Sequence, residues 1–144
     1  MKYFTIKELT KSSTATAKGL DNTPTPQAVT NLHALVDNVL DPLREAWGKP
    51  IYVNSGYRSP AVNKAVGGAA TSQHVTGQAV DITASPKTDN GYLFRLIERL
   101  KLPYDQLIWE KGNDQYPDWI HISYVDNNRH QKLRYANGKY TPIS

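Results

Sequence analysis

Residues 72–81 read SQHVTGQAVD, and this stretch is the most informative part of the chain. It places the imidazole of His74 seven residues before the carboxylate of Asp81, and Gly77 between them allows the backbone to turn from a loop into a strand. A second imidazole, His121, lies in the strand-like segment WIHIS at residues 119–123. Two histidines and one aspartate are a ligand set that zinc uses in hydrolases, with one coordination position left for water. The sequence therefore predicts a metallohydrolase if these three residues meet in the fold.

Strand alternation brings the candidate ligands to one polar face. Asp81 alternates with Val80 and Ile82, and His121 alternates with the isoleucines on either side of it. The polar face of each strand can then line a common cleft while the apolar face packs into a core. A second interpretation fits the same spacing, in which Asp81 ends a strand and both histidines are satisfied by hydrogen bonds without a metal.

The composition is that of one folded domain. The 144 residues fit a single core, and 39% hydrophobic with 21% charged residues argue against disorder. Because the chain has no cysteine, any metal must be held by nitrogen and oxygen ligands. The net charge of +4 favours an anionic partner such as nucleic acid or a bacterial wall, or it belongs to a generic soluble surface.

No apolar run reaches the length of a signal peptide or a membrane span. We therefore expect synthesis in the cytoplasm, and release without a cleaved signal if the protein acts outside the cell. Residues 1–25 are polar and rich in turn formers, which predicts an irregular N-terminal arm.

The remaining elements follow from periodicity and from capping residues. A helix is expected to begin near Thr25-Pro26, to kink or divide at Pro42 and to end at Gly48 and Pro50. Further helices are expected at residues 59–66 and 90–101, and strands at 51–53, 79–83, 106–109, 119–124 and 132–135. Early helices and late strands favour a single α+β domain over residues 1–144, with helices packed on a small, mainly antiparallel sheet.

Four sequence blocks carry a resemblance to a known family: SGYRS at 55–59, SQHVTGQAVD at 72–81, DQLI at 105–108 and WIH at 119–121. Together they resemble the zinc D-alanyl-D-alanine carboxypeptidases and related phage endolysins, whose fold is shared with the hedgehog signalling domain. The similarity spans about residues 28–124. It implies a fold of the hedgehog and D,D-peptidase type.

The resemblance also implies roles for individual residues. His74, Asp81 and His121 would bind Zn²⁺, and Arg58 would steady negative charge on the scissile carbonyl oxygen. The alternative for Arg58 is a structural salt bridge after a turn. Ser72 matches a family position that contacts substrate, although a serine there can also cap the loop.

The general base has two candidates. Relatives carry a glutamate three residues before the last histidine, and Asp118 occupies that position here. Strict alternation places Asp118 on the face opposite His121, so that only a bend after Pro117 would bring both inward. Glu110 is the rival. The resemblance favours Asp118.

The resulting prediction is a monomeric zinc metallopeptidase that hydrolyses D-Ala-containing peptides or cross-links of bacterial peptidoglycan, as an endolysin acting on the cell wall after release. The alternative is a non-catalytic, zinc-containing module that binds the wall, and the departure at Asp118 supports it. Nucleic-acid binding is not expected, because no Arg- and Lys-rich recognition helix and no aromatic-basic motif is present.

Overall fold

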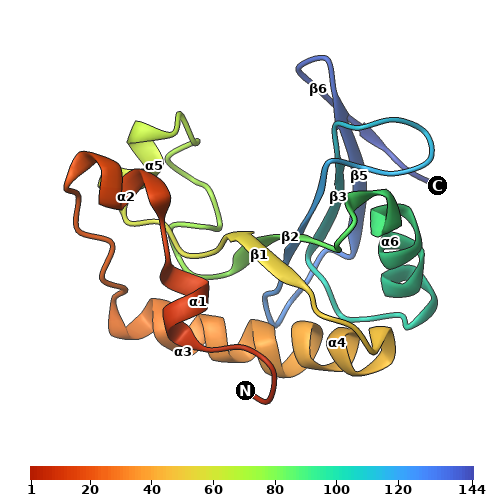
Figure 1. Cartoon of the computed structure of the whole chain (residues 1–144), viewed down its shortest axis with the longest axis horizontal. Helices are drawn as coiled ribbons and strands as arrows, with labels where there is room; N and C mark the ends of the chain where they lie inside the picture. Colours follow the sequence, from red (N-terminus) through yellow and green to blue (C-terminus); the bar gives the residue numbers. More distant parts are fainter.

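A six-stranded sheet with strand order β1-β2-β4-β3-β5-β6 forms the centre of the computed structural model, which describes residues 1–144 (Figure 1). All neighbouring strands are antiparallel except β3 and β5, which run parallel. The expected α+β class with a small, mainly antiparallel sheet is confirmed. The strands are β1 (Tyr52–Ser55), β2 (Ala79–Thr83), β3 (Gln106–Glu110), β4 (Trp119–Ser123), β5 (Gln131–Ala136) and β6 (Lys139–Pro142).

Two of the helices begin at the Thr-Pro and Ser-Pro pairs that the sequence predicted as helix starts. Thr25 caps α3 by accepting a hydrogen bond from the amide of Ala28 at 3.1 Å, and Pro26 is the first residue of the helix. Ser59 caps α5 in the same way. The helical elements are α1 (Ile6–Thr10), α2 (Ser13–Lys18), α3 (Pro26–Leu35), η1 (Val36–Leu40), α4 (Asp41–Trp47), α5 (Pro60–Ala65), η2 (Lys87–Asp89) and α6 (Asn90–Arg99).

The helix expected to kink or divide at Pro42 instead changes its winding just before that proline. The segment η1 is π-helical, and the amide of Asp41 donates to the carbonyl of Val36, five residues back. A wider turn at this point relieves the clash between a proline ring and the preceding turn of an α-helix. The helix then continues as α4 and ends at Gly48, whose φ of +71° is left-handed.

The N-terminal residues 1–25 are not an irregular arm, because they contain the two short helices α1 and α2. Thr5 accepts a hydrogen bond from the amide of Glu8, and the Glu8 carboxylate accepts one from the amide of Thr5. This capping box is visible in the sequence as Thr-x-x-Glu. Ser12 caps α2 through the amide of Ala15. Each helix is too short to show a hydrophobic period, which is why periodicity missed both.

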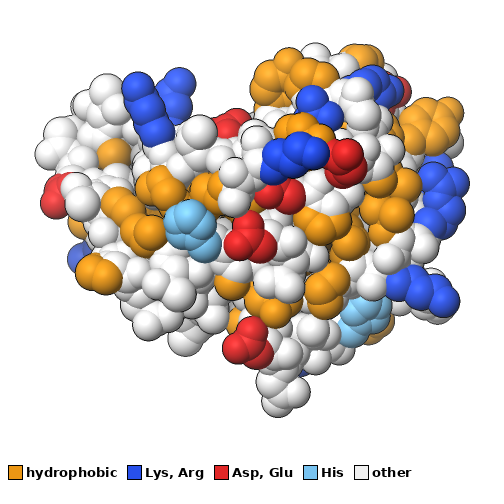
Figure 2. All heavy atoms as spheres, turned by 90° about the horizontal axis from the view of Figure 1, so that it is seen from below, with side chains coloured by type: hydrophobic (Ala, Val, Ile, Leu, Met, Phe, Trp, Pro, Cys, Tyr) orange, Lys and Arg blue, Asp and Glu red, His pale blue; other side chains and the backbone are white.

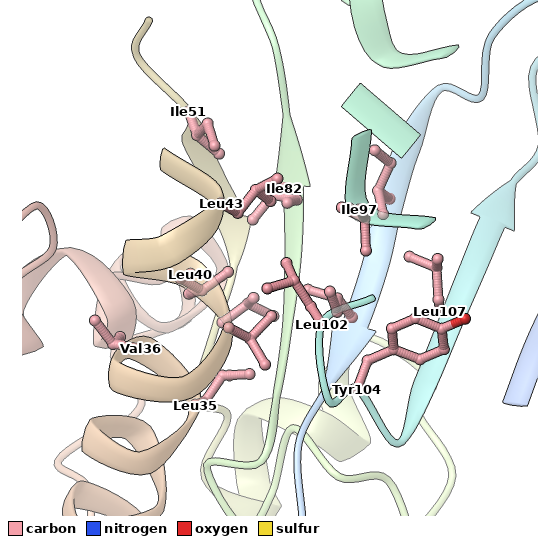
Figure 3. Packing of buried hydrophobic residues seen from close by; sticks show 14 of the residues in the cluster. Leu35, Val36, Leu40, Leu43, Ile51, Ile82, Ile97, Leu102, Tyr104 and Leu107 are labelled. Atoms are coloured by element: carbon pink, nitrogen blue, oxygen red, sulfur yellow. The ribbon is translucent and has the colours of Figure 1, made fainter. Parts of the chain in front are cut away.

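One face of the sheet is buried under helices. Val80 and Ile82 of β2 and Ile120 and Ile122 of β4 have no exposed surface, and they belong to a core cluster of 23 buried residues. Figure 3 shows leucines of the α3–α4 segment beside Ile82, with Ile97 of α6 close to the same layer. The alternating residues on the opposite face are therefore free to form a site.

The strand β6 was not predicted. Asn137 and Gly138 both have positive φ, 53° and 76°, and they join β5 to β6 in a tight hairpin. Asn-Gly is a strong hairpin signal, so the sequence contained the evidence for this strand.

Figure 2 views the molecule from the side on which α3 and α4 lie in Figure 1. On this face, lysine and arginine side chains stand in separate groups with acidic and apolar side chains between them. No helix of the protein combines the length and the apolar character needed to cross a bilayer.

Candidate metal centre and active site

Three potential metal ligands converge on the polar face of the sheet. Asp81 of β2 and His121 of β4 are register partners across the two strands, and His74 comes from the loop before β2. Oδ1 of Asp81 lies 3.1 Å from Nδ1 of His121 and 3.4 Å from Nε2 of His74. The three ligand atoms lie within 4.8 Å of one another. The structure thus brings together the residues that the sequence singled out.

The ring of His74 is held in one orientation. Its Nδ1 lies 2.8 Å from the carbonyl oxygen of Gly56, so Nδ1 carries the proton and Nε2 presents a lone pair to the site. Gly56 itself passes so close to α1 that a Cβ would lie 2.1 Å from the carbonyl oxygen of Leu9. The amide of Arg58 donates to the carbonyl of His74 at 3.0 Å and fixes the loop further.

Gly77 makes the turn that separates His74 from Asp81. Its φ is +73°, and a Cβ there would lie 2.5 Å from the carbonyl oxygen of Ala28 in α3. The expected turn is confirmed, and the structure adds a second reason for glycine, which is the close packing of the loop on the helix.

Asp81 is ionised in this environment. Burial by itself would raise the pKa of its carboxyl, but the neighbouring imidazoles of His121, which hydrogen-bonds to it, and His74 outweigh burial and lower the pKa below its ordinary value. A buried carboxylate between two imidazole nitrogens is a donor set that fits a divalent metal such as zinc. The residues present therefore satisfy the chemistry of the expected site.

Arg58 lies beside the ligand cluster. Its Nη2 is 3.6 Å from Oδ2 of Asp81, Nε donates to Oγ of Ser55 at 3.1 Å, and Nη1 donates to Oδ1 of Asn63 at 3.2 Å. The guanidinium is therefore clamped on several sides, with 18% of the side chain exposed.

Ser72 also borders the site, and its Oγ accepts a hydrogen bond from the amide of His74 at 3.2 Å. Ser72 thus caps the loop that carries His74, and it also lines the cleft.

A cleft of about 730 Å³ opens over the ligand cluster. One wall is the segment between α5 and β2, and the other is the polar face of β3, β5 and β6; in Figure 1 these segments rise as two lobes on either side of β2. Residues of β5 and β6, such as Leu133 and Tyr140, reach this cleft although sequence reasoning assigned them no role.

Glu110 lies in this cleft, with 9% of its surface exposed. The pKa of its carboxyl is raised to about 7, mainly by burial; His121 and Lys111 lower the pKa, and the charge of Asp81 raises it. A carboxyl group that titrates near neutral pH beside a metal site can take and return a proton.

Asp118, which the resemblance favoured as the base, does not lie in the cleft. Its carboxylate accepts a hydrogen bond from Nζ of Lys87 at 3.2 Å, and it borders a separate depression with Tyr52 and Thr83. The amide of Asp118 donates to the carbonyl of Glu110 at 2.9 Å and continues the β3–β4 ladder. The bend after Pro117 that would turn this side chain toward His121 is therefore absent, and alternation separates the two residues.

Comparison with known proteins agrees with this geometry. A family model described as Peptidase M15 matches residues 2–123. The zinc D-Ala-D-Ala carboxypeptidase of Streptomyces albus G is 40% identical to this chain over 83 residues. That alignment covers 56% of this chain and 31% of the relative, so the chain spans about a third of the length of that protein.

Proposed function

The chain belongs to the peptidase M15 family, and from this premise we propose that it is a zinc-dependent metallopeptidase that hydrolyses D-Ala-containing peptides of bacterial peptidoglycan. The observation that carries the proposal is the convergence of His74, Asp81 and His121 in a cleft that also contains Glu110 and Arg58. The name of the Streptomyces relative supports both zinc and the D-Ala-D-Ala substrate class.

In this proposal, Nε2 of His74, Nδ1 of His121 and a carboxylate oxygen of Asp81 hold the zinc ion. Bound zinc lowers the pKa of a water molecule toward neutrality and polarises a carbonyl group. The hydrogen bond from His74 to the carbonyl of Gly56 keeps one ligand nitrogen unprotonated and directed at the ion.

Glu110 takes the role of general base. Its carboxylate oxygen accepts a proton from the attacking water and returns it to the nitrogen of the departing amine. In the metal-free protein burial raises the pKa of Glu110 to about 7, which makes this carboxylate a stronger base than an ordinary glutamate. The side chain of Glu110 is one methylene longer than that of Asp118. Glu110 also lies in the cleft, whereas Asp118 lies outside it.

Arg58 donates hydrogen bonds to the scissile carbonyl oxygen as negative charge develops on it. Because its Ser55 and Asn63 contacts fix the guanidinium in advance, little reorganisation is needed when that charge appears. Ser72 contacts the substrate beside the ligand loop.

The alternative of a non-catalytic module that binds the wall was supported by the shorter side chain of Asp118. Glu110 favours catalysis instead, because it supplies a second carboxylate in the cleft that contains the proposed metal ligands. We place the enzyme as a monomer at the bacterial cell wall after release from the cytoplasm, as a lysin would act. The net charge of +4 is consistent with an anionic wall.

The direct test combines metal analysis with digestion of purified peptidoglycan, with and without a chelator. Stoichiometric zinc and cleavage that the chelator abolishes and zinc restores are the expected results. Mass spectrometry of the products separates the two modes, because a carboxypeptidase releases free D-alanine and an endopeptidase releases larger fragments. Cleavage by metal-free protein would refute the proposal.

A further inference from the structure

A second arginine stands on the far wall of the cleft. Arg129 precedes β5, lies beyond the residues matched by the family model, and borders the same cleft as the metal ligands. Its Nε and Nη2 donate to the two carboxylate oxygens of Asp105 at 3.1 and 2.7 Å, and its amide donates to the same carboxylate at 2.8 Å. This is the paired geometry in which arginine binds a carboxylate most specifically.

Asp105 connects this arginine to the opposite wall. Its side chain is 1% exposed, and Nε2 of Gln73, the residue before the ligand His74, donates to it at 2.8 Å. The hydrogen bond from Arg129 is the main cause that lowers the pKa of Asp105 to about 2, so the carboxyl is ionised at neutral pH. Asp105 is therefore a positioning residue, because its buried carboxylate fixes the guanidinium of Arg129.

The arrangement leaves part of the arginine unused. The Arg129 side chain is 56% exposed although its partner is buried, and Nη1 has no hydrogen-bond partner in the protein. An arginine has five N–H donors, and Asp105 takes only two of them from the side chain. The remaining donors are available to a ligand in the cleft.

Besides Arg129, one arginine or lysine side chain borders the cleft, and it is Arg58. Its guanidinium is already paired with Asp81, Ser55 and Asn63. Arg129 is thus the cation in the cleft that is free to bind an anionic group at a distance from the reacting bond.

Resting on the proposed function, we infer that Arg129 binds a carboxylate of the peptide substrate and contributes to its selection. A stem peptide offers two such groups, the C-terminal carboxylate and the free α-carboxylate of its γ-linked D-glutamate. The chemistry of recognition is the same for both, and the experiment distinguishes them.

The test uses zinc-loaded protein and three synthetic peptides: L-Ala-γ-D-Glu-L-Lys-D-Ala-D-Ala, its C-terminal amide, and the analogue in which the α-carboxylate of D-glutamate is an amide. For the R129Q variant, KM for the parent peptide should rise about tenfold or more with little change in kcat, the size expected for a lost charge-assisted hydrogen bond. One amide peptide should show no such change, and its identity names the carboxylate that Arg129 contacts. R129K should restore the parent KM only in part, because lysine keeps the charge but lacks the fork.

The matched control is R134Q. Arg134 forms a similar ion pair with Asp114 but lies outside the cleft, so KM for all three peptides should be unchanged. The double variant D105N/R129Q guards against unfolding, because it removes the buried charge together with its partner; it should show the same peptide dependence as R129Q. An equal change for all three peptides, or no change for any, would overturn the inference.

Calorimetric binding of the same peptides to zinc-loaded E110Q and E110Q/R129Q separates this inference from the proposed function. If wild-type protein cleaves none of the peptides, the proposed function fails. The Arg129 inference then stands when R129Q still weakens binding of the carboxylate peptide relative to its amide, and it fails when the affinities match.

Discussion

Asp81 and His121 face each other directly across β2 and β4, with Oδ1 and Nδ1 of the two side chains 3.1 Å apart. The metal centre therefore depends on strand register as much as on residue identity. A slip of one residue would send one side chain into the core, and the fully buried Ile120 and Ile122 on the other face oppose such a slip.

Replacing a ligand should abolish metal binding. H121A and D81N are expected to lose zinc, because two remaining ligands do not hold the ion at physiological zinc concentrations. Metal analysis measures this directly. In thermal unfolding, a chelator should lower the Tm of the wild type and leave the Tm of H121A unchanged, since only the wild type gains stability from the ion. An equal shift in both proteins would place the zinc elsewhere.

Replacing Glu110 should remove the general base. E110Q is expected to retain zinc and to lose at least about 100-fold in kcat, the range for a single acid–base group. E45Q is the matched control, because Glu45 lies on α4 and pairs with Lys2 at the surface. D118N should keep normal kcat and cost less than about 1 kcal/mol, as expected for an exposed ion pair with Lys87. The reverse pattern, with D118N inactive and E110Q active, would restore the base that the resemblance favoured.

The pKa of Glu110 also predicts a pH-dependent stability. Burial raises this pKa from 4.5 to about 7 in the folded protein. Well below pH 4.5 the Glu110 carboxyl is protonated in the folded and in the unfolded protein. Between pH 4.5 and about 7 the unfolded chain has released this proton, whereas the folded protein still holds it. The wild type is therefore destabilised as the pH rises through this window. In zinc-free protein, E110Q should gain on the order of 3 kcal/mol in free energy of unfolding relative to the wild type between pH 4 and pH 8. Urea unfolding at the two pH values checks it, and a difference that does not depend on pH would contradict it.

Replacing Arg58 should lower kcat more than it raises KM. R58Q removes a donor to the developing oxyanion, which typically costs about 100-fold to 1,000-fold in kcat. R58K should recover little of this loss, because an ammonium group cannot bond Ser55 and Asn63 and the substrate with the same geometry. Steady-state kinetics with zinc-loaded protein measures both constants. An increase in KM alone would assign Arg58 to substrate binding only.

Gly77 and Gly19 form a matched pair for the ligand turn. Both have positive φ, +73° and +65°, but a Cβ would meet the Ala28 carbonyl at Gly77 and nothing within 4 Å at Gly19. G19A should cost about 1–2 kcal/mol from backbone strain alone, and G77A should cost roughly 1–3 kcal/mol more from the added clash. Chemical denaturation of both variants tests the difference, and equal losses would show that packing on α3 contributes nothing.

Much of the fold was predictable because local chemistry determines it. Thr25-Pro26 and Ser59-Pro60 are helix starts that need no tertiary information, and the alternation around Asp81 and His121 assigned their faces correctly. The same alternation argued against Asp118 as the base, and the structure agrees with the alternation rather than with the resemblance.

The cleft was harder to predict because it depends on long-range pairing. Glu110 was a candidate for the general base. Its burial and its raised pKa depend on residues distant in the sequence, such as Asp81 and His121, and no local pattern shows them. The parallel pairing of β3 with β5 joins residues 25 positions apart, and without it neither Arg129 nor Tyr140 could be placed in the cleft.

The hairpin of β5 and β6 pairs with the rest of the sheet only through β3, whereas the metal ligands of the sheet lie on β2 and β4. The metal ligands of the sheet and the hairpin that follows Arg129 are therefore carried by separate pieces of chain. A different hairpin could be grafted onto β3 without altering any ligand, and under the proposed function such a graft would exchange the substrate preference while keeping the metal site.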